Sequence, residues 1–237
     1  MPFKIEAKCL ICAEDKVPLK EEVTATCDLC GETFQADSTC VNGHYVCHMC
    51  RQKAAREGII KYCQTSEHTQ PYPLLLELMK LPGVAMHGPE HHLLLTAALL
   101  TAYCNEKGKQ KELAEYLDEA NSRSIGVPGA ACGFWGICGA AIGSGIYMSI
   151  LTEASPYAEV EWKAVGQCTV RCADAVSKEG GPRCCKRDSF LSMMEAIEHS
   201  NNILGTHFEA PEDIRCTFYP NNEECKQRAC PFFPTRK

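Results

Sequence analysis

Cysteines are the residues most able to do chemistry in this chain, and their spacing divides them into two sets. There are 18 of them in 237 residues. The first eight lie within residues 9–63, where three C-x-x-C pairs occur, and the other ten are spread from Cys104 to Cys230. The chain does not open with an apolar segment and a small-residue cleavage site, so we expect a reducing, cytoplasmic setting in which C-x-x-C pairs bind metal instead of forming disulfides. The first set predicts zinc, and the second predicts a site of iron–sulfur or thiol chemistry.

The first zinc site is predicted from two of the C-x-x-C pairs. Zinc takes four ligands in a tetrahedron, and one C-x-x-C turn supplies two of them. The pairs at residues 27–30 and 47–50 therefore predict a site of the zinc-ribbon type, and the segment between them should form a β-hairpin that turns at Asn42-Gly43. Such a site is closed, so we expect it to serve structure or docking and not catalysis.

A second zinc site is predicted from the remaining donors of this region. The pair at residues 9–12 would be joined by Cys40 and His44, in a cross-braced or a sequential order, unless Cys63 or His68 takes the place of His44. One or two zinc ions are therefore expected, on eight candidate ligands: Cys9, Cys12, Cys27, Cys30, Cys40, His44, Cys47 and Cys50.

A histidine-rich segment, MHGPEHH, predicts acid–base groups around the start of a helix. Residues 87–91 also fit the H-x-x-E-H pattern of a zinc peptidase. We discount a peptidase because Pro89 places the first histidine before the helix, whereas that pattern needs both histidines on one helix face. The candidates for proton transfer are Glu90 with His91 or His92, and the alternative is a capped helix with surface histidines.

Two adjacent cysteines in GGPRCCKRD, residues 180–188, form the most distinctive motif. They follow a Gly-Gly-Pro turn and precede a helix, and basic side chains surround them. Positive charge and a helix N-terminus both lower a thiol pKa, so we predict a nucleophile or a cluster ligand here, with Arg183 or Lys186 holding an anionic substrate. A purely structural pair is the alternative. The candidate catalytic residues are Glu90, His91, His92, Arg183, Cys184, Cys185 and Lys186.

Glycine and cysteine also alternate in CGFWGICGAAIGSGI, residues 132–146. Small residues there allow close approach of the backbone to a cluster or an anion, and Gly139-x-x-x-Gly143 predicts close helix packing. The tail carries three more cysteines, the last followed by proline, as in iron–sulfur segments. We predict a cluster with one open iron, held by three of these residues: Cys132, Cys138, Cys184, Cys185, Cys216, Cys225 and Cys230.

The elements that must position these residues are mainly helices. Residues 1–50 have few apolar positions and many turn formers, so metal must supply their folding energy. After residue 64 the apolar spacing is helical and no β-rich stretch occurs. We predict a small zinc-ribbon-like β module at residues 1–63, ending in a helix over 51–63, and a mainly α-helical domain at residues 74–237. Helices are expected over 73–81, 90–106, 109–123, 134–153 and 160–178, and from an N-cap at Asp188.

Charge and hydropathy narrow the class of protein. The net charge of −6 argues against broad nucleic-acid binding, which needs many phosphate contacts, and the charges of residues 1–63 are nearly balanced. Residues 127–151 carry no charge and are long enough to span a bilayer. Pro128 and frequent glycines instead predict a helix buried in a protein core, with no membrane contact.

The motifs MHGPEHH, CGFWGICGAAIGSGI and GGPRCCKRD, followed by the spaced tail cysteines that end in CPFF, resemble a cysteine-rich family of unknown function from anaerobic archaea and bacteria. The resemblance covers about residues 74–234. Members are sometimes fused to radical-SAM or methyltransferase modules, and the amino-terminal module is similar to one often seen with this domain. The resemblance carries no catalytic assignment, but an anaerobic setting implies an oxygen-sensitive cluster in preference to free thiols.

These observations favour a metal-dependent cytoplasmic enzyme that acts on a small anionic or sulfur-bearing substrate. Desulfidation, sulfur transfer and lyase chemistry all fit a cluster or thiol of this kind. Two alternatives stay open. One is a non-enzymatic zinc-ribbon adaptor or metal/redox sensor that docks on a partner enzyme, and the other is an accessory factor for tRNA thiolation.

Overall fold

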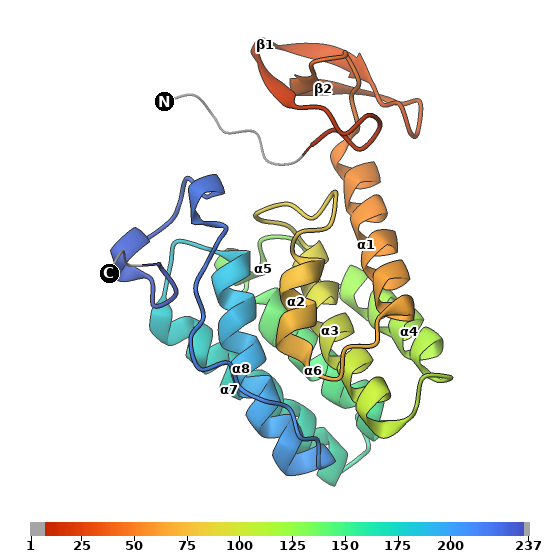
Figure 1. Ribbon diagram of the computed structural model, residues 1–237, viewed down its shortest axis with the longest axis vertical. Coiled ribbons are helices and arrows are strands. Elements are labelled where there is room, and N and C mark those ends of the chain that lie inside the picture. Colours follow the sequence, from red (N-terminus) through yellow and green to blue (C-terminus); the bar gives the residue numbers. More distant parts are fainter. Residues whose placement is uncertain (1–7, 235–237) are drawn as a thin grey trace.

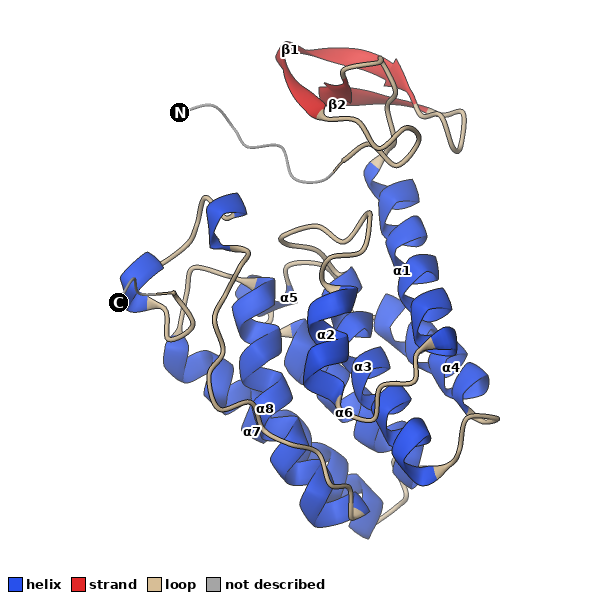
Figure 2. Ribbon diagram, viewed as in Figure 1, coloured by secondary structure: helices blue, strands red, loops and turns tan. Residues whose placement is uncertain are grey.

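At one end of the protein lies a two-stranded sheet flanked by cysteine knuckles, and below the sheet lies a body of helices (Figures 1 and 2). The structure, a computed structural model, describes residues 8–234. The predicted fold class, a small β module followed by a mainly α domain, is confirmed. The elements run in the order β1 (Lys16–Thr26), β2 (Thr33–Cys40), α1 (His48–Thr65), α2 (Pro71–Leu78), α3 (Glu90–Lys107), α4 (Leu113–Ile125), α5 (Ala131–Phe134), α6 (Gly139–Thr152), α7 (Val160–Glu179), α8 (Cys185–Leu204), η1 (Tyr219–Asn221) and η2 (Gln227–Ala229).

The sheet is a hairpin built around a cysteine knuckle. Strand β1 pairs antiparallel with β2, and the connection between them is the knuckle at residues 27–32, closed by a backbone hydrogen bond of 2.8 Å between its ends. The expected turn at Asn42-Gly43 was wrong. Gly43, at φ +83°, belongs instead to the next knuckle, where its N–H donates to the Cys40 carbonyl oxygen at 2.8 Å. The knuckles themselves supply the tight turns, so the strands lie between knuckles and begin earlier than the sequence predicted.

Helix α1 joins the sheet to the body. It starts within the last C-x-x-C pair of the region, the fourth knuckle along the chain at residues 47–50, with Cys47 as its N-cap. From there it runs down the side of the body (Figure 1). One face of it, including Ile59, is fully buried in the core of the body. Arg56 fixes it further, because its guanidinium donates to Ser124 Oγ at 2.8 Å and to the Pro89 carbonyl oxygen at 3.3 Å. The helix thus belongs to both parts of the molecule.

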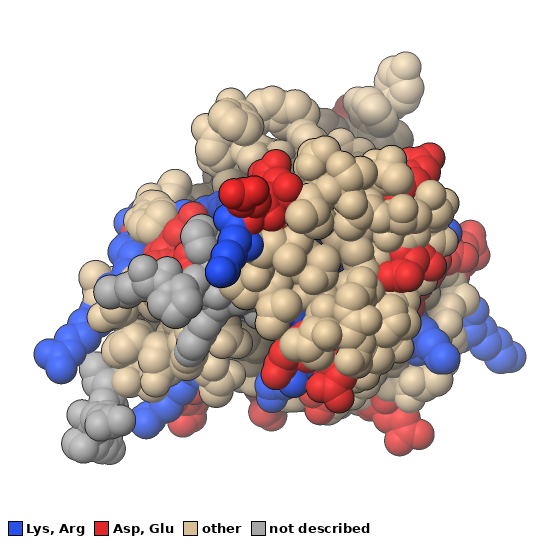
Figure 3. Space-filling model, turned by 90° about the horizontal axis from the view of Figure 1, so that it is seen from above, with Lys and Arg blue, Asp and Glu red and all other residues tan. Residues whose placement is uncertain are grey.

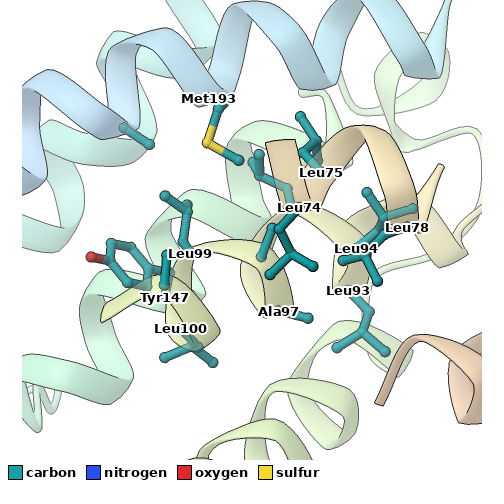
Figure 4. Packing of buried hydrophobic residues seen from close by; sticks show 14 of the residues in the cluster. Leu74, Leu75, Leu78, Leu93, Leu94, Ala97, Leu99, Leu100, Tyr147 and Met193 are labelled. Carbon is teal, nitrogen blue, oxygen red and sulfur yellow. The ribbon is translucent and has the colours of Figure 1, made fainter. Parts of the chain in front are cut away.

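The core of the body is centred on α3. Every residue of α3 from Glu90 to Cys104 is buried, and α1, α2, α4, α6 and α8 all contact this helix. Figure 4 shows leucines of α2 and α3 packing with Tyr147 of α6 and Met193 of α8. A helix that is apolar on every side lies at the centre of a bundle, which explains the uninterrupted run LLLTAALLTAY.

The glycine-rich helix α6 packs closely on α3, as predicted. A Cβ at Gly143 would lie 2.6 Å from the His92 carbonyl oxygen, and a Cβ at Gly139 would overlap the His92 ring. The small residues therefore let the backbones of α3 and α6 approach closely. The Thr96 hydroxyl of α3 can then donate to the Gly143 carbonyl oxygen of α6 at 2.8 Å. Among the residues that the structure describes, no helix has the length and apolar character to cross a membrane.

Helix α8 begins four residues before the expected start. Its N-cap is Cys184, whose sulfur accepts from the Arg187 N–H at 3.5 Å, and Asp188 lies in the first turn. A sulfur thus takes the capping place that sequence rules give to a carboxylate. After α8 the chain turns back and runs along this helix to its amino-terminal end, with only the short turns η1 and η2 (Figure 1).

Candidate functional site

The eight amino-terminal candidate ligands come together in two groups. In each group the ligand atoms all lie within 4.8 Å of one another, so each could hold one metal ion, consistent with zinc. The ligand pairs alternate along the chain, the first joining the third and the second joining the fourth, which is the cross-braced order. The groups are Cys9, Cys12, Cys40 and His44, and Cys27, Cys30, Cys47 and Cys50.

The surroundings of these atoms suit metal ligation. Backbone N–H groups point at the sulfurs, as with Ile11 N to Cys9 Sγ at 3.4 Å and Asn42 N to Cys40 Sγ at 3.3 Å. A backbone N–H two residues on, at Glu14, is the largest of the effects that lower the pKa of Cys12 to about 6, which favours the thiolate that zinc binds. Nδ1 of His44 is buried with no hydrogen-bond partner among the described residues.

The sheet and the two ligand groups, within residues 8–50, form what we call the metal module. A cavity of about 300 Å³ lies where the body meets this module, and we call it the helix-end cavity. It is bordered by α5, by the loop before α3, and by the amino-terminal ends of α3, α6 and α8. His48, at the start of α1, also lines it. Helix N-termini present unpaired N–H groups and partial positive charge, which favours anions. The side chains that line it and can do chemistry are His48, His87, His91, His92, Cys132, Cys138, Arg183, Cys185 and Asp188.

His91 has the most distinctive environment in this cavity. It is fully buried, and its Nδ1 lies 3.1 Å from the Gly88 carbonyl oxygen, so Nδ1 carries the proton and Nε2 holds the lone pair. Nε2 is buried without a hydrogen-bond partner among the described residues. Burial, and then the positive charge of Lys186, hold the pKa of His91 well below its usual range. The imidazole is therefore neutral, with an unpaired nitrogen that can accept a hydrogen bond or bind a metal.

The neighbouring acid–base candidates differ from His91. His92 also lines the cavity, and its Nδ1 has no hydrogen-bond partner within residues 8–234. Burial, followed by the charge of Arg56, lowers the pKa of His92 to about 4. Glu90 does not line the cavity. Its carboxylate accepts from the Ala85 N–H at 2.9 Å and fills the space that a Cβ on Gly88 would need. Glu90 therefore holds the loop before α3 in place.

The seven carboxy-terminal cysteines named as cluster ligands fall into two places. Three line the helix-end cavity: Cys132, Cys138 and Cys185. The other four line a second, smaller cavity between α8 and the tail, which we call the tail cavity: Cys184, Cys216, Cys225 and Cys230. The consecutive residues Cys184 and Cys185 therefore serve different cavities.

The expectation of a lowered thiol pKa at the Cys184/Cys185 pair was wrong. Burial raises the pKa of Cys184 to about 11 and that of Cys185 to about 12, and it raises the pKa of Cys138 to about 12. Desolvation outweighs the helix N-terminus here, because the thiols lie in a low-dielectric interior. As free thiols these groups would be protonated at neutral pH.

The basic residues around the pair also separate. Arg183 lines the helix-end cavity and is half exposed, with its Nε 3.6 Å from a Glu224 oxygen. Lys186 is directed elsewhere, since its Nζ donates to the Met79 carbonyl oxygen at 3.2 Å and lies over the Phe218 ring. Of the two residues expected to hold an anion, only Arg183 is placed to do so.

Sequence reasoning missed three residues. His48 is hidden inside a C-x-x-C pair, and Asp188 was read only as a helix cap, although its Oδ2 lies 3.9 Å from Cys138 Sγ. Asn222 of the tail bridges the two cavities, with its Oδ1 3.2 Å from His87 Nε2 and its Nδ2 3.5 Å from Cys184 Sγ. No local spacing signals Asn222, because the contact depends on the return of the tail along α8.

On the face seen from the metal-module end, Lys and Arg do not gather in one cluster among the residues that the structure describes (Figure 3). Seen from the metal-module end, basic and acidic side chains are scattered around a broad area that bears no charged side chain (Figure 3). A phosphate-binding face would show clustered Lys and Arg.

Known proteins resemble the chain in two respects. A sequence relative, E3 ubiquitin-protein ligase NLA from Arabidopsis thaliana, is 29% identical over 115 residues, which are 48% of this chain and 33% of that protein. The chain thus spans about a third of the length of that relative. No solved structure matches. The model of the family of unknown function DUF5714 matches residues 59–233, a range that contains the body and the tail and leaves out both amino-terminal ligand groups. The chain belongs to the DUF5714 family.

Proposed function

We propose that the protein is a metal-dependent enzyme that acts on sulfur in a small anionic substrate, with its active site in the helix-end cavity. The observation that carries the proposal is His91, a buried, neutral imidazole whose Nε2 has no partner among the described residues and which lines a cavity of about 300 Å³. A polar atom left unpaired in a protein interior costs free energy, so a site that keeps one is a site for a ligand. Three thiols share the cavity with it.

The three cysteines of the cavity would hold an iron–sulfur cluster with one iron open. The backbone N–H groups of Ala140 and Ala141 point at Cys138, and that of Gly88 points at Cys185, which stabilises negative charge on sulfur. The open iron of such a cluster supplies a Lewis acid that binds the sulfur of a substrate.

The protein's own residues would supply binding and orientation. Arg183, at the border of the cavity, would bind a carboxylate or similar anionic group, helped by the helix N-termini. His91 Nε2 would accept a hydrogen bond from the thiol of the substrate and so orient its sulfur, since the lowered pKa of His91 keeps the ring neutral.

The test begins with full-length protein purified without oxygen, analysed for iron, labile sulfide and zinc. His91→Asn should keep the cluster and the hydrogen bond to Gly88, because the asparagine amide can occupy the place of Nδ1, while it removes Nε2. We expect release of sulfide from small thiol-bearing carboxylates to fall by about 10²-fold, as for a reacting group that is no longer held in place. His91→Gln, which places a polar atom near Nε2, should recover part of the activity.

A matched control is Cys104→Ala, which removes a buried cysteine that lines neither cavity, against Cys138→Ala, which should lose cluster and activity together. The proposal fails if the anaerobic protein holds no iron or sulfide, or if His91→Asn turns over as fast as the parent.

A second candidate function, docking of a partner protein, is favoured by the surface of the metal module. Each of its four ligand pairs encloses an exposed apolar side chain, and all four are more than 40% exposed: Ile11, Leu29, Val41 and Met49. Knuckles that carry apolar side chains to the surface form a ready contact site. The relative named as an E3 ubiquitin-protein ligase makes a protein-binding module a reasonable comparison.

This second candidate has its own measurement. Proximity labelling in cells should give one reproducible partner that is lost when the four apolar side chains are replaced by serine, and the purified pair should bind directly with the same dependence. Ile203→Ser, at an exposed apolar position of the body, serves as the control. Equal labelling by the parent and the four-residue variant would exclude docking through these knuckles.

A further inference from the structure

Four cysteines meet at the amino-terminal end of α8, apart from the helix-end cavity. Cys184 is the N-cap of α8, and the tail supplies the other three when it returns along this helix (Figure 1). The walls of the tail cavity are otherwise mainly apolar, and among them the Phe190 and Phe232 rings meet edge to face at 5.5 Å. Four cysteine sulfurs therefore line one largely apolar and aromatic pocket. The four are Cys184, Cys216, Cys225 and Cys230.

The N–H groups around these sulfurs repeat the pattern of the amino-terminal metal knuckles. Gln227 N lies 3.3 Å from Cys225 Sγ, two residues earlier, as Asn42 N lies 3.3 Å from Cys40 Sγ in a ligand group of the metal module. Cys184 Sγ accepts at 3.5 Å from the side-chain N–H of Asn222, and also from a backbone N–H. Such N–H···S contacts stabilise thiolates that bind metal.

Backbone donors also approach the two remaining sulfurs. The N–H groups of Phe218 and Tyr219 point at Cys216, and that of Phe232 points at Cys230. A backbone bond from Cys216 N to the Phe232 carbonyl oxygen, at 2.8 Å, ties these two parts of the tail together. All four sulfurs therefore receive at least one N–H, and the tail is ordered around them with little regular secondary structure.

The spacing of the four sulfurs distinguishes this site from the zinc-like groups. A single zinc ion with bonds of about 2.3 Å draws its sulfurs to within about 4 Å of one another. The two amino-terminal groups have that compactness, whereas no three of these four sulfurs lie mutually within 4.8 Å in the part of the chain that the structure describes. Four cysteines that line one cavity without that compactness suit a larger group than a single ion.

We infer that Cys184, Cys216, Cys225 and Cys230 bind a [4Fe–4S] cluster in the tail cavity, separate from the site of the proposed reaction. Full ligation by four thiolates closes this cluster to substrate, so it has a structural or electron-carrying character. Arg187 and Lys226 line the same cavity, and each also pairs with a carboxylate, Asp188 at 3.0 Å and Glu179 at 2.6 Å. Because Cys184 and Cys185 are consecutive, this cluster lies beside the helix-end cavity. The inference stands whether or not that cavity is an active site.

The test compares two double variants of the full chain, purified without oxygen or reconstituted with ferrous iron and sulfide. Cys225→Ser/Cys230→Ser should lower iron and labile sulfide by about four each per chain. Zinc content should not change, and it reports that the metal module is intact. Cys132→Ser/Cys138→Ser should leave this cluster in place, and Cys104→Ser should change nothing.

A second measurement guards against simple misfolding of the tail. Mössbauer spectra of the ⁵⁷Fe-loaded Cys132→Ser/Cys138→Ser variant should show one [4Fe–4S] cluster with four sulfur-ligated irons. Iron that is lost from this variant but kept by Cys225→Ser/Cys230→Ser would overturn the inference and leave the proposed function standing. Iron with the opposite dependence would support the inference and remove the cluster from the proposed active site. Zinc in the tail cavity, or no metal there, would also overturn the inference.

Discussion

The metal module and the helical body are both rich in cysteine, but they use it in opposite ways. In the described part of the module the buried apolar side chains are Ala36 and four cysteines that belong to the ligand groups. In the body a continuous core of leucines and other apolar side chains surrounds α3 (Figure 4). Several buried cysteines are also part of this core. In the module, ligand cysteines occupy the buried positions that apolar side chains usually take. In the body, apolar side chains form the core, and other cysteines line the two cavities.

This difference indicates where the stability of each part comes from. A segment with almost no apolar burial cannot offset the entropy of ordering its backbone, so the ligand groups must hold the module together. The body has a continuous apolar core, so we expect it to fold without metal.

Metal removal should produce the largest effect. Stripping zinc with a strong chelator should abolish the amide protection of β1 and β2 in hydrogen exchange, because structural zinc sites supply apparent binding free energies of about 10–16 kcal/mol at pH 7. Amides in the middle of α3 should stay protected. The comparison between module and body breaks if β1 and β2 remain protected after elemental analysis shows that zinc is gone.

A core substitution should show the reverse dependence. Leu94 is fully buried at the centre of the body, so Leu94→Ala should lower the free energy of unfolding of the body by about 2–5 kcal/mol. Leu29 is exposed in a knuckle of the module, and Leu29→Ala should change that free energy by less than about 0.5 kcal/mol. Denaturant unfolding followed by helical circular dichroism measures both, with and without chelator. A Leu94→Ala cost that vanishes when zinc is removed would contradict independent stabilisation.

Features set by local spacing could be predicted from the sequence. The C-x-x-C pairs, with Cys40 and His44, indicated the two ligand groups, because pairs of donors three or four residues apart leave few ways to complete a tetrahedron. The helices followed from apolar periodicity, and the close contact of α6 with α3 followed from the spacing of its glycines.

Features set by the path of the chain could not be predicted. The division of the seven carboxy-terminal cysteines between two cavities depends on the tail lying along α8, and no residue pattern encodes that return. The same holds for His48, which reaches the helix-end cavity only because α1 packs on the body. The thiol pKa values at Cys184 and Cys185 were misjudged because burial, which the sequence does not show, outweighs nearby charge.

The smallest effect concerns a buried histidine of the body, remote from every ligand group. His199 of α8 donates from Nε2 to the Ala164 carbonyl oxygen of α7 at 3.0 Å, and burial is the main cause that lowers its pKa below the usual 6.5. Arg171 of α7 lowers it further, while Glu198 opposes the shift. Because the unfolded chain takes up this proton first, the stabilising contribution is present above about pH 6.5 and declines as the pH falls below that value.

His199→Gln tests this sign, because a glutamine amide can donate to the same carbonyl and does not titrate. The difference in unfolding free energy between parent and variant, measured from pH 7.5 to pH 5 on chelated protein, should shift against the parent as the pH falls. The shift should be smaller than the cost of Leu94→Ala. The charged neighbours of His199, Arg171 and Glu198, are partly exposed and act in opposite directions, whereas Leu94→Ala removes most of a fully buried side chain. Working without zinc removes acid release of metal from the module as a cause, so a surviving pH dependence belongs to the body. A difference that stays constant across this range would mean that His199 titrates alike in the folded and unfolded chain, and the body would then contribute no acid sensitivity through this residue.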